Sequence, residues 1–381
     1  MNLKILIVCP TLDMEKPFSA TPFLRQLFKA LHKIGNEIIL VPYSGKSVQS
    51  KWWKCYPNPN LSKSEFLEKF IKITKSSRLI SNKLIPILAQ KFAKPQLEKL
   101  LKKIITKEQD VAVVIFIAIP LNQITGISLE LKKYFQIPVL FYDVDLPTSL
   151  PEYGGFTFNY YPGANLSEYD SILVTSEGSI NRLKELGADN IETVHIGIDP
   201  DEYKPIDIKK DIDFFFFGHG GQSRKNFVKM MITEPSKTLN YNFVIGGRNY
   251  KMDLGNAKFL SSNITFPKWI EYSSRSKVNL NVVHELHAKT FATSTARPFE
   301  LSALGCCIVS SPYNGLEKWF DTKKEILISN STEECLEIYD FLMNNPETRL
   351  KMGIAARNKV LKEHTSSHRA KQIIQIIKKY R

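Results

Sequence analysis

The chain has 381 residues, 43% of them hydrophobic and 11% aromatic, so it is long enough for two domains with separate cores and too apolar to be disordered. Its five cysteines are odd in number and irregularly spaced, which excludes a disulfide framework and favours a reducing compartment. The first apolar run, residues 5–9, ends at Pro10 and is too short for a signal peptide, and no later run approaches a membrane span. We therefore expect a cytoplasmic protein.

The first 200 residues alternate short apolar runs with amphipathic ones. Continuous apolar strands separated by helices are typical of a parallel, doubly wound sheet. We predict strands at 4–9, 37–42, 111–119, 138–142, 171–175 and 192–195, and helices at 22–34, 122–135 and 177–186.

A basic insertion interrupts this first series. Residues 46–107 contain fifteen Lys and Arg against three Glu, a net charge of +12 in a chain whose total is +14. We predict helices at 64–76, 78–92 and 95–106, and the last has an apolar face formed by Leu97, Leu100, Leu101 and Ile104. Basic amphipathic helices suit an anionic membrane surface, an anionic acceptor or nucleic acid, and the alternative is a solvated lysine face on ordinary domain helices. No nucleic-acid-binding motif accompanies the charge, which makes nucleic acid the less favoured partner.

A second alternating series follows a Pro- and Asp-rich linker at 198–205. We predict strands at 212–217, 241–245, 264–266, 278–283, 306–310 and 326–328, and helices at 332–344, 346–364 and 367–379. The fold class is therefore α/β, with two Rossmann-like domains that place their ligands beyond the carboxyl ends of the strands.

The segment from Arg297 to Gly305, with sequence RPFELSALG, predicts a helix that begins beside a phosphate site. Pro298 suits the first helical position, and Glu300 then falls in the first turn. Polar residues 293–295 lead into this helix from an open loop. Its free N–H groups suit a phosphate, and the nearby carboxylate suits two ribose hydroxyls.

This R-x-F-E-x-x-A-x-G pattern resembles the donor-binding helix of GT-B glycosyltransferases, most closely the spore-maturation (CgeB-like) and group 1 families. Further segments match GT-B patterns in the expected order, and together they cover most of the chain. They are 23–39, 169–178, 186–188, 195–205, 276–281 and 363–369. The resemblance implies an acceptor domain over 1–200 that includes the basic insertion, a nucleotide-sugar donor domain over 201–365, and a C-terminal helix at 366–381 returning to the first domain.

Two features depart from the family pattern. Many retaining GT-B enzymes carry a second Glu eight residues before the ribose Glu, and here that position is Ala292. Glu285 lies further upstream on what we expect to be a longer loop, so it does not simply inherit the role. The basic pair after the first donor-domain strand is only loosely matched, by Arg224 and Lys225.

The resemblance and the residue types together predict a donor site. Gly218, Gly220 and Gly221 follow a buried strand, and glycine lets the backbone turn sharply and approach a ligand closely. Cationic side chains would neutralise the leaving diphosphate without a metal. The residues predicted to bind the nucleotide and diphosphate are Gly218, Gly220, Gly221, Arg224, Lys225, Thr295, Arg297 and Glu300, with Arg297 equally able to form a salt bridge with Glu300. Glu300 is also a candidate catalytic residue.

Other residues are candidates for contacts with the sugar or the acceptor. Asp143 and Asp145 follow a strand whose end faces the acceptor in GT-B proteins, so either is a candidate catalytic residue that orients or deprotonates a hydroxyl. Asp145 capping a turn is the alternative. The D-x-D spelling also matches the metal signature of GT-A transferases, which two Rossmann-like domains argue against, and we expect no metal. His284 and Glu285 are candidates for sugar contacts.

The sequence therefore predicts a hexosyltransferase-like enzyme without a cofactor. The resemblance implies a UDP- or GDP-linked sugar donor, a retaining, metal-independent reaction, and an acceptor that is a surface or lipid-linked glycan, a protein or a small molecule. The basic insertion also suggests that the protein can associate peripherally with the inner face of the membrane. The alternatives are a transferase that modifies nucleic acid, and a catalytically silent sugar-nucleotide-binding or interaction protein, the latter suggested by Ala292.

Overall fold

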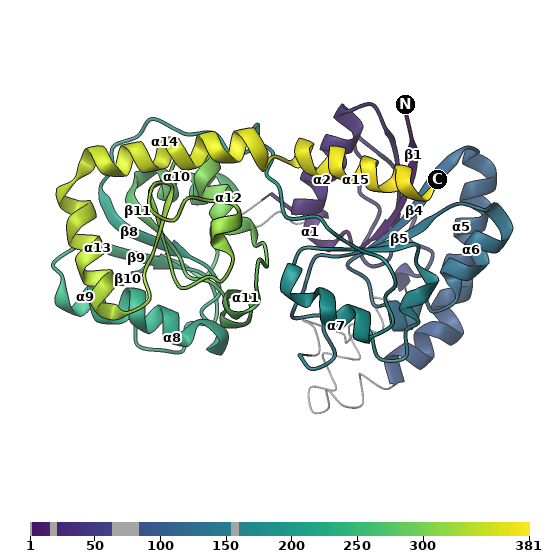
Figure 1. Ribbon diagram of the computed structural model, residues 1–381, viewed down its shortest axis with the longest axis horizontal. Coiled ribbons are helices and arrows are strands. Elements are labelled where there is room, and N and C mark those ends of the chain that lie inside the picture. Colours follow the sequence, from purple (N-terminus) through teal and green to yellow (C-terminus); the bar gives the residue numbers. More distant parts are fainter. Residues whose placement is uncertain (1, 16–20, 63–83, 154–159) are drawn as a thin grey trace. The chain divides into compact units, whose positions relative to one another are not determined.

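The computed structural model describes residues 2–15, 21–62, 84–153 and 160–381 (Figure 1). The chain divides into two compact units. Unit 1 comprises Met1–Lys16, Phe28–His195 and Ala370–Arg381, and unit 2 comprises Pro17–Leu27 and Ile196–Arg369. Across the described residues, no helix combines the length and the apolar character required to span a bilayer.

Unit 1 is built on a parallel sheet with strand order β3-β2-β1-β4-β5-β6-β7 among the described residues. The strands are β1 (Lys4–Cys9), β2 (Glu37–Pro42), β3 (Lys54–Cys55), β4 (Val111–Ile117), β5 (Val139–Asp143), β6 (Ser171–Val174) and β7 (Ile191–Thr193). Every residue of β4 and β5 is buried, as expected for central strands covered on both faces.

Helices cover the sheet of unit 1. They are α1 (Leu12–Glu15), α2 (Phe23–Lys33, which crosses the unit boundary), α5 (Lys94–Glu108), α6 (Ile127–Phe135), α7 (Ile180–Glu185) and α15 (Ser366–Tyr380, mostly in this unit). A π-helical turn, η1 (Ala89–Ala93), leads into α5, and 3-10 turns occur at η2 (Leu121–Gln123), η3 (Leu166–Glu168) and η4 (Glu177–Ser179). Helices α5 and α6 lie side by side in Figure 1 and pack Leu101 and Leu131 into one core.

Unit 2 has a second parallel sheet with order β10-β9-β8-β11-β12-β13 among the described residues. Its strands are β8 (Ile212–Phe217), β9 (Phe243–Gly246), β10 (Lys258–Phe259), β11 (Ser276–Asn281), β12 (Ile308–Ser310) and β13 (Ile326–Ile328). Side chains of consecutive strand residues point to opposite faces of a sheet. In β8, Phe214 and Phe215 accordingly belong to two different core clusters, one on each face.

Figure 1 shows the helices of unit 2 in two layers around its sheet, with α10, α12 and α14 on one side and α8, α9 and α13 on the other. Their bounds are α8 (Lys225–Val228), α9 (Glu234–Thr238), α10 (Phe266–Arg275), α11 (Glu285–Lys289), α12 (Ala296–Ala303), α13 (Thr332–Asn344) and α14 (Pro346–Glu363). Short turns η5 (Gln222–Arg224), η6 (Lys229–Thr233) and η7 (Leu316–Lys318) complete the unit.

The prediction of two Rossmann-like parallel sheets is confirmed, and three details of it are wrong. The predicted strand at 264–266 does not form, because Pro267 lies in the first turn of α10, and β10 takes the edge position beside β9 instead. The predicted loop around Glu285 is the short helix α11. Pro298 is the third residue of α12 rather than the first, since the helix begins at Ala296.

The structure revises the interpretation of the basic insertion. The predicted helix at 64–76 lies outside the described residues, and the one at 78–92 is described only from residue 84. The third corresponds to α5, but its apolar face is core rather than a free surface, with Leu97 2% and Leu101 0% exposed. The amphipathic pattern of α5 therefore provides no membrane-facing surface.

Each sheet has one point where the strand order reverses. In unit 1 it lies between β1 and β4, and in unit 2 between β8 and β11. The connections on either side of such a point leave in opposite directions, so ligands bind there beyond the carboxyl ends of the strands. The residues just after these four strands are therefore the first place to look for function.

Candidate functional site

The glycine-rich loop after β8 is interlocked with the loop after β9. Gly218 N donates to Gly246 O at 3.1 Å, and Gly220 N donates to Arg248 O at 2.8 Å. Gly247 has φ +119°, and a Cβ on it would lie 1.8 Å from Gly218 O. Close packing of the two loops thus explains part of the need for glycine, and backbone contact with a phosphate stays a prediction for Gly218, Gly220 and Gly221.

Arg224 lies beneath this loop with its charge directed at the ends of the central strands. Its Nε donates to Val282 O at 3.0 Å and its Nη1 to His219 O at 3.2 Å. Burial lowers the pKa of this guanidinium. No carboxylate forms an ion pair with Arg224 among the residues that the structure describes, so its charge is balanced only by carbonyl dipoles. Lys225, by contrast, is exposed at the start of α8.

Arg297 and Glu300 form the ion pair that the sequence left as an alternative. Arg297 Nη1 lies 3.1 Å from Glu300 Oε2. The two atoms are not aligned as a hydrogen bond, and this buried nitrogen has no hydrogen-bond partner in the described part of the chain. The Arg297 guanidinium also covers the ring of Trp269 at 4.5 Å. Its positive charge is close enough to Arg224 to contribute to the lowered pKa of that residue.

Glu300 is held from its other side by a tyrosine. The side chain is 3% exposed, and Oε1 accepts a hydrogen bond from Tyr203 OH at 3.0 Å. Tyr203 OH in turn accepts from Thr21 N at 3.1 Å. A ribose would therefore have to displace Tyr203 or Arg297 from the carboxylate, so the clamp role of Glu300 stays a prediction that requires local rearrangement.

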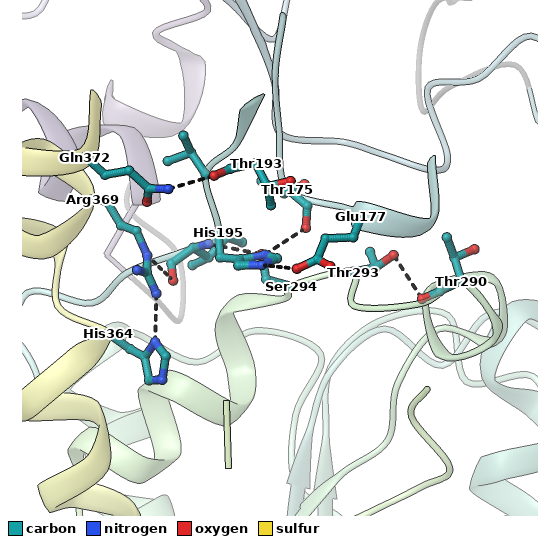
Figure 2. A network of polar contacts seen from close by, with 12 residues as sticks. Thr175, Glu177, Thr193, His195, Thr290, Thr293, Ser294, His364, Arg369 and Gln372 are labelled. Carbon is teal, nitrogen blue, oxygen red and sulfur yellow. Dashed lines mark hydrogen bonds and ion pairs between the residues drawn. The ribbon is translucent and has the colours of Figure 1, made fainter. Parts of the chain in front are cut away.

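The N-terminus of α12 is approached by a buried loop rather than the open one that we expected. Thr295 is the N-cap residue in an extended conformation, and its side chain makes no capping hydrogen bond. Thr293 and Ser294 are buried: Thr293 Oγ1 donates to Thr290 O at 3.2 Å, and Ser294 Oγ accepts from Ile196 N at 3.0 Å (Figure 2). The side chain of Thr295 accepts from Tyr313 OH at 3.2 Å.

Three histidines surround Arg224. Burial and the charge of Arg224 lower the pKa of His284 to about 4, and burial, His284 and Arg224 lower that of His287 to about 3. Burial also lowers the pKa of His219. His284 caps α11 by accepting from Leu286 N at 3.2 Å. At neutral pH, His284 and His287 are therefore neutral groups that can donate or accept hydrogen bonds without adding positive charge.

The structure shows the surroundings of Glu285 and Ala292, the two positions considered for the second family carboxylate. Glu285 Oε1 accepts from Asn226 Nδ2 at 3.0 Å, which ties it to α8. Ala292 is fully buried at φ +45°, and its N–H donates to Asn314 O at 3.0 Å. Gly315 packs directly against it. A larger side chain at position 292 would be strained in this conformation.

In unit 1, the carboxylate of Asp143 is enclosed by donors. It is fully buried at the end of β5 and accepts from Asp145 N at 2.8 Å, Ser149 Oγ at 2.5 Å and Tyr161 OH. Burial, helped by the charge of Asp145, raises the pKa of Asp143 to about 6. With its oxygens occupied by protein donors, Asp143 is better suited to position the loop than to touch a substrate.

Asp145 is the more accessible carboxylate. It is half-buried and accepts from Tyr160 OH at 2.9 Å, and burial raises its pKa. The edge formed beyond β1, β2 and β4 adds further hydroxyl and amide groups, since Tyr43 OH donates to Gln123 Oε1 at 2.5 Å. Gln123 Nε2 is buried and lacks a hydrogen-bond partner among the described residues. We call Tyr43, Gln123, Asp145 and Tyr160 the polar edge of unit 1.

The sequence reasoning did not single out His195 and Glu177, which form an imidazole–carboxylate pair in unit 1. Figure 2 shows His195 Nε2 facing Glu177 Oε1 at 3.3 Å and Nδ1 facing Thr175 O at 3.4 Å. Both residues follow the carboxyl ends of neighbouring strands, β6 and β7. Their positions just after these strands could have identified them as candidates. The sequence analysis included them only within the longer segments that match GT-B patterns.

The C-terminal signature at 363–369 has a structural role. Arg369 donates to Ile196 O at 3.3 Å, and its Nη2 lies 2.8 Å from His364 Nδ1 (Figure 2). Ile198 N donates to His364 O, and Ser366 N to Ile198 O. These bonds fasten the segment that enters unit 2 to the junction of α14 and α15. In the described ranges no three His, Cys, Asp or Glu side chains gather as metal ligands.

Comparison with known proteins agrees with this arrangement. Residues 224–375 match a family model described as glycosyl transferase-like. A comparison with curated proteins finds no match.

Solved structures resemble the chain along nearly its whole length. A sucrose-phosphate synthase from Thermosynechococcus elongatus aligns at 12% identity and TM-score 0.68, covering 99% of both chains. HepE from Anabaena in complex with UDP aligns at 10% identity and TM-score 0.63, covering 99% of this chain and 100% of that one. An E. coli structure named trehalose-6-phosphate, bound with UDP-2-fluoro glucose, aligns at 12% identity and TM-score 0.64, covering 98% and 99%.

These likenesses confirm the fold as GT-B. The matched segment, which covers most of unit 2 and reaches into α15, is similar to a glycosyl transferase-like family. The narrower resemblance to the CgeB-like subgroup is not part of that finding.

Proposed function

We propose that the protein transfers a sugar from a nucleotide sugar to an acceptor hydroxyl. The observation that supports this most is the pair of cations in unit 2. Arg224 lacks a carboxylate partner, and Arg297 has a buried nitrogen without a hydrogen bond, each in the described part of the chain. Both lie where the strand order reverses, which suits the two phosphates of a nucleoside diphosphate.

In the proposed reaction, the acceptor oxygen forms a bond to the anomeric carbon as the bond from that carbon to the phosphate breaks. Arg224, Arg297 and the start of α12 stabilise the charge that develops on the leaving diphosphate, so no divalent ion is required. The acceptor proton passes to the leaving phosphate, as in a retaining mechanism, with Asp145 orienting the hydroxyl. Glu300 binds the ribose once it parts from Tyr203.

UDP is the favoured nucleotide within this proposal, with GDP as the other candidate, because two structural neighbours hold UDP or a UDP-sugar. The acceptor is a lipid-linked or surface glycan, a protein or a small molecule, and the protein works in the cytoplasm. A CgeB-like subgroup stays the family assignment that its motifs favour.

A panel of nucleotide sugars tests the proposal directly. Thermal shift with UDP, GDP and their common sugar conjugates should identify one nucleotide, and the same conjugate should be hydrolysed slowly without acceptor. Arg297→Ala should weaken both responses, whereas Arg248→Ala, in the loop after β9, provides the control. Binding without hydrolysis would favour the silent sugar-nucleotide-binding protein. No response to any conjugate would contradict the proposal.

A further inference from the structure

A helical stretch of unit 1 carries four large apolar side chains on its outer surface. Leu84, Ile87, Leu88 and Phe92 are each between 42% and 62% exposed. The first three follow the i, i+3, i+4 spacing of one helix face. The π-helical turn at 89–93 adds one residue to the repeat, so Phe92, eight residues after Leu84, returns to that face. We call these four residues the apolar stripe.

The apolar stripe is not needed to pack helical residues 84–93 against the rest of unit 1. Ile85 and Ala89 are buried on the inner side, and the continuing helix α5 buries Leu97 and Leu101. Gln90 Nε2 donates to Asn122 O at 2.6 Å, and Asn60 Nδ2 donates to Ala93 O at 2.9 Å. With these anchors formed, the stripe is surplus apolar surface, which commonly marks an interaction site.

The charge around the stripe selects the kind of partner. Lys91 lies next to Phe92, with its Nζ 5.5 Å from the ring centroid. The segment 46–107 in which the stripe lies carries a net charge of +12. An apolar face with Lys91 beside it, in a segment of strongly positive sequence, suits the boundary between the headgroups and acyl chains of an anionic membrane. A purely apolar protein groove would leave this charge without a counterpart.

The stripe is also close to the polar edge. Asn122, which receives the bond from Gln90, precedes Gln123, and Asn122 N donates to Tyr160 O at 3.0 Å. Gln123 Nε2 still needs an acceptor, and Tyr160 contacts Asp145. The helical stretch that carries the apolar stripe is therefore connected to the polar edge through the hydrogen bonds of Gln90 and Asn122.

We propose that the apolar stripe docks unit 1 on an anionic membrane and that the acceptor is a membrane lipid. Its hydroxylated head group would reach Gln123 and Asp145 while its chains stay in the bilayer. This inference rests on the proposed transfer reaction and narrows its acceptor from several classes to one.

Vesicle binding tests the docking surface. The full-length protein should sediment with vesicles of phosphatidylglycerol and phosphatidylcholine and much less with phosphatidylcholine alone. The quadruple variant Leu84→Gln, Ile87→Gln, Leu88→Gln, Phe92→Gln should bind at least tenfold more weakly. A matched control replaces Phe341, Leu350 and Ile354 of unit 2, which are 50% to 65% exposed, with Gln and should bind as wild type. Equal binding of stripe variant and wild type, or wild-type binding to duplex DNA in place of vesicles, overturns the docking.

Label transfer tests the acceptor. The nucleotide sugar that the protein hydrolyses is supplied with a labelled sugar moiety, together with either the total lipid extract or the aqueous extract of the cells that make the protein. Label in the lipid phase, reduced at least tenfold by the stripe variant while hydrolysis without acceptor is unchanged, supports the proposal. Label confined to water-soluble material, or hydrolysis with no transfer to lipid, overturns it. Intact vesicle binding without nucleotide binding would instead defeat the proposed transfer function.

Discussion

The two units share one architecture but present different chemistry at corresponding places. In unit 2, the strand-order reversal is surrounded by Arg224, Arg297 and neutral histidines, and a glycosyl transferase-like model matches residues 224–375. In unit 1, the reversal is surrounded by tyrosines, an amide and two carboxyl groups with raised pKa values, and the matched segment reaches only into α15. Within the proposed function, this difference suits unit 2 to neutralising a diphosphate and unit 1 to recognising neutral hydroxyls.

Arg224→Ala should give the largest effect and would test the charged half of this comparison. The guanidinium supplies positive charge at a partly buried strand end, so its loss should slow donor hydrolysis by about 10²–10³-fold. Steady-state release of the nucleoside diphosphate measures this. Arg224→Lys should recover part of the rate, because it restores the charge without both carbonyl contacts. Unchanged hydrolysis by a folded Arg224→Ala protein would show that the charge of Arg224 does not assist the reaction.

Asp143→Asn tests the description of unit 1 through the pH dependence of its stability. Burial raises the pKa of Asp143 from 3.8 to about 6, so in that interval the folded state retains a proton that the unfolded chain has released. The stability contributed by this protonation is complete below the unfolded pKa and is lost as pH rises through about 6. The free energy of unfolding of wild type should therefore fall, relative to the variant, by roughly 2 kcal/mol from pH 4 to pH 7.

Urea unfolding at several pH values, followed by circular dichroism, measures this difference. Asp189→Asn, on the surface of the same unit, corrects for the change in net charge. A wild type that gains stability relative to Asp143→Asn over this range would show that its donors, Ser149 and Tyr161, outweigh its burial.

The fold could be predicted from the sequence because both sheets consist of short apolar strands with helices between them. The prediction failed where contacts with other parts of the fold, rather than local sequence preference, determine the structure. Residues 264–266 look like a strand, but α10 begins at Phe266 with Pro267 in its first turn. The apolar face of α5 looked free for a membrane because no sequence pattern shows which apolar face meets the core.

Parts of the candidate site could be proposed from the sequence where a single residue type suits the chemistry, and their roles stay predictions. Arg224 and Arg297 were identified as cations near glycines and a helix start, and the structure brings them together in unit 2. Tyr203 could not be predicted as the partner of Glu300, because their contact joins residues 97 positions apart. The burial of Asp143 depends on Tyr161 and Ser149, which no local motif connects to it.

Glu300→Gln should weaken binding of the nucleoside diphosphate about tenfold, which is a smaller effect than loss of Arg224. A carboxylate that accepts two ribose hydroxyls contributes charge-assisted bonds of roughly 1.5–3 kcal/mol, part of which the amide retains. Isothermal titration with UDP or GDP measures the affinity. Tyr203→Phe separates binding from structure, because it removes the bond to Oε1 but keeps the carboxylate. If both variants lose affinity equally, Glu300 acts by supporting the fold rather than by holding ribose.

The smallest expected effect is that of removing divalent ions, and it bears on both units at once. If Arg224, Arg297 and the start of α12 carry the leaving-group charge, EDTA should leave donor hydrolysis unchanged, and Mn²⁺ or Mg²⁺ should not increase it. The oxygens of Asp143 already accept from Ser149, Tyr161 and Asp145 N, so an ion could enter the D-x-D sequence only by displacing them. Activity lost in EDTA and restored by Mn²⁺ would show that Arg224, Arg297 and the start of α12 do not carry the leaving-group charge alone, and the division of chemistry between the two units would fail.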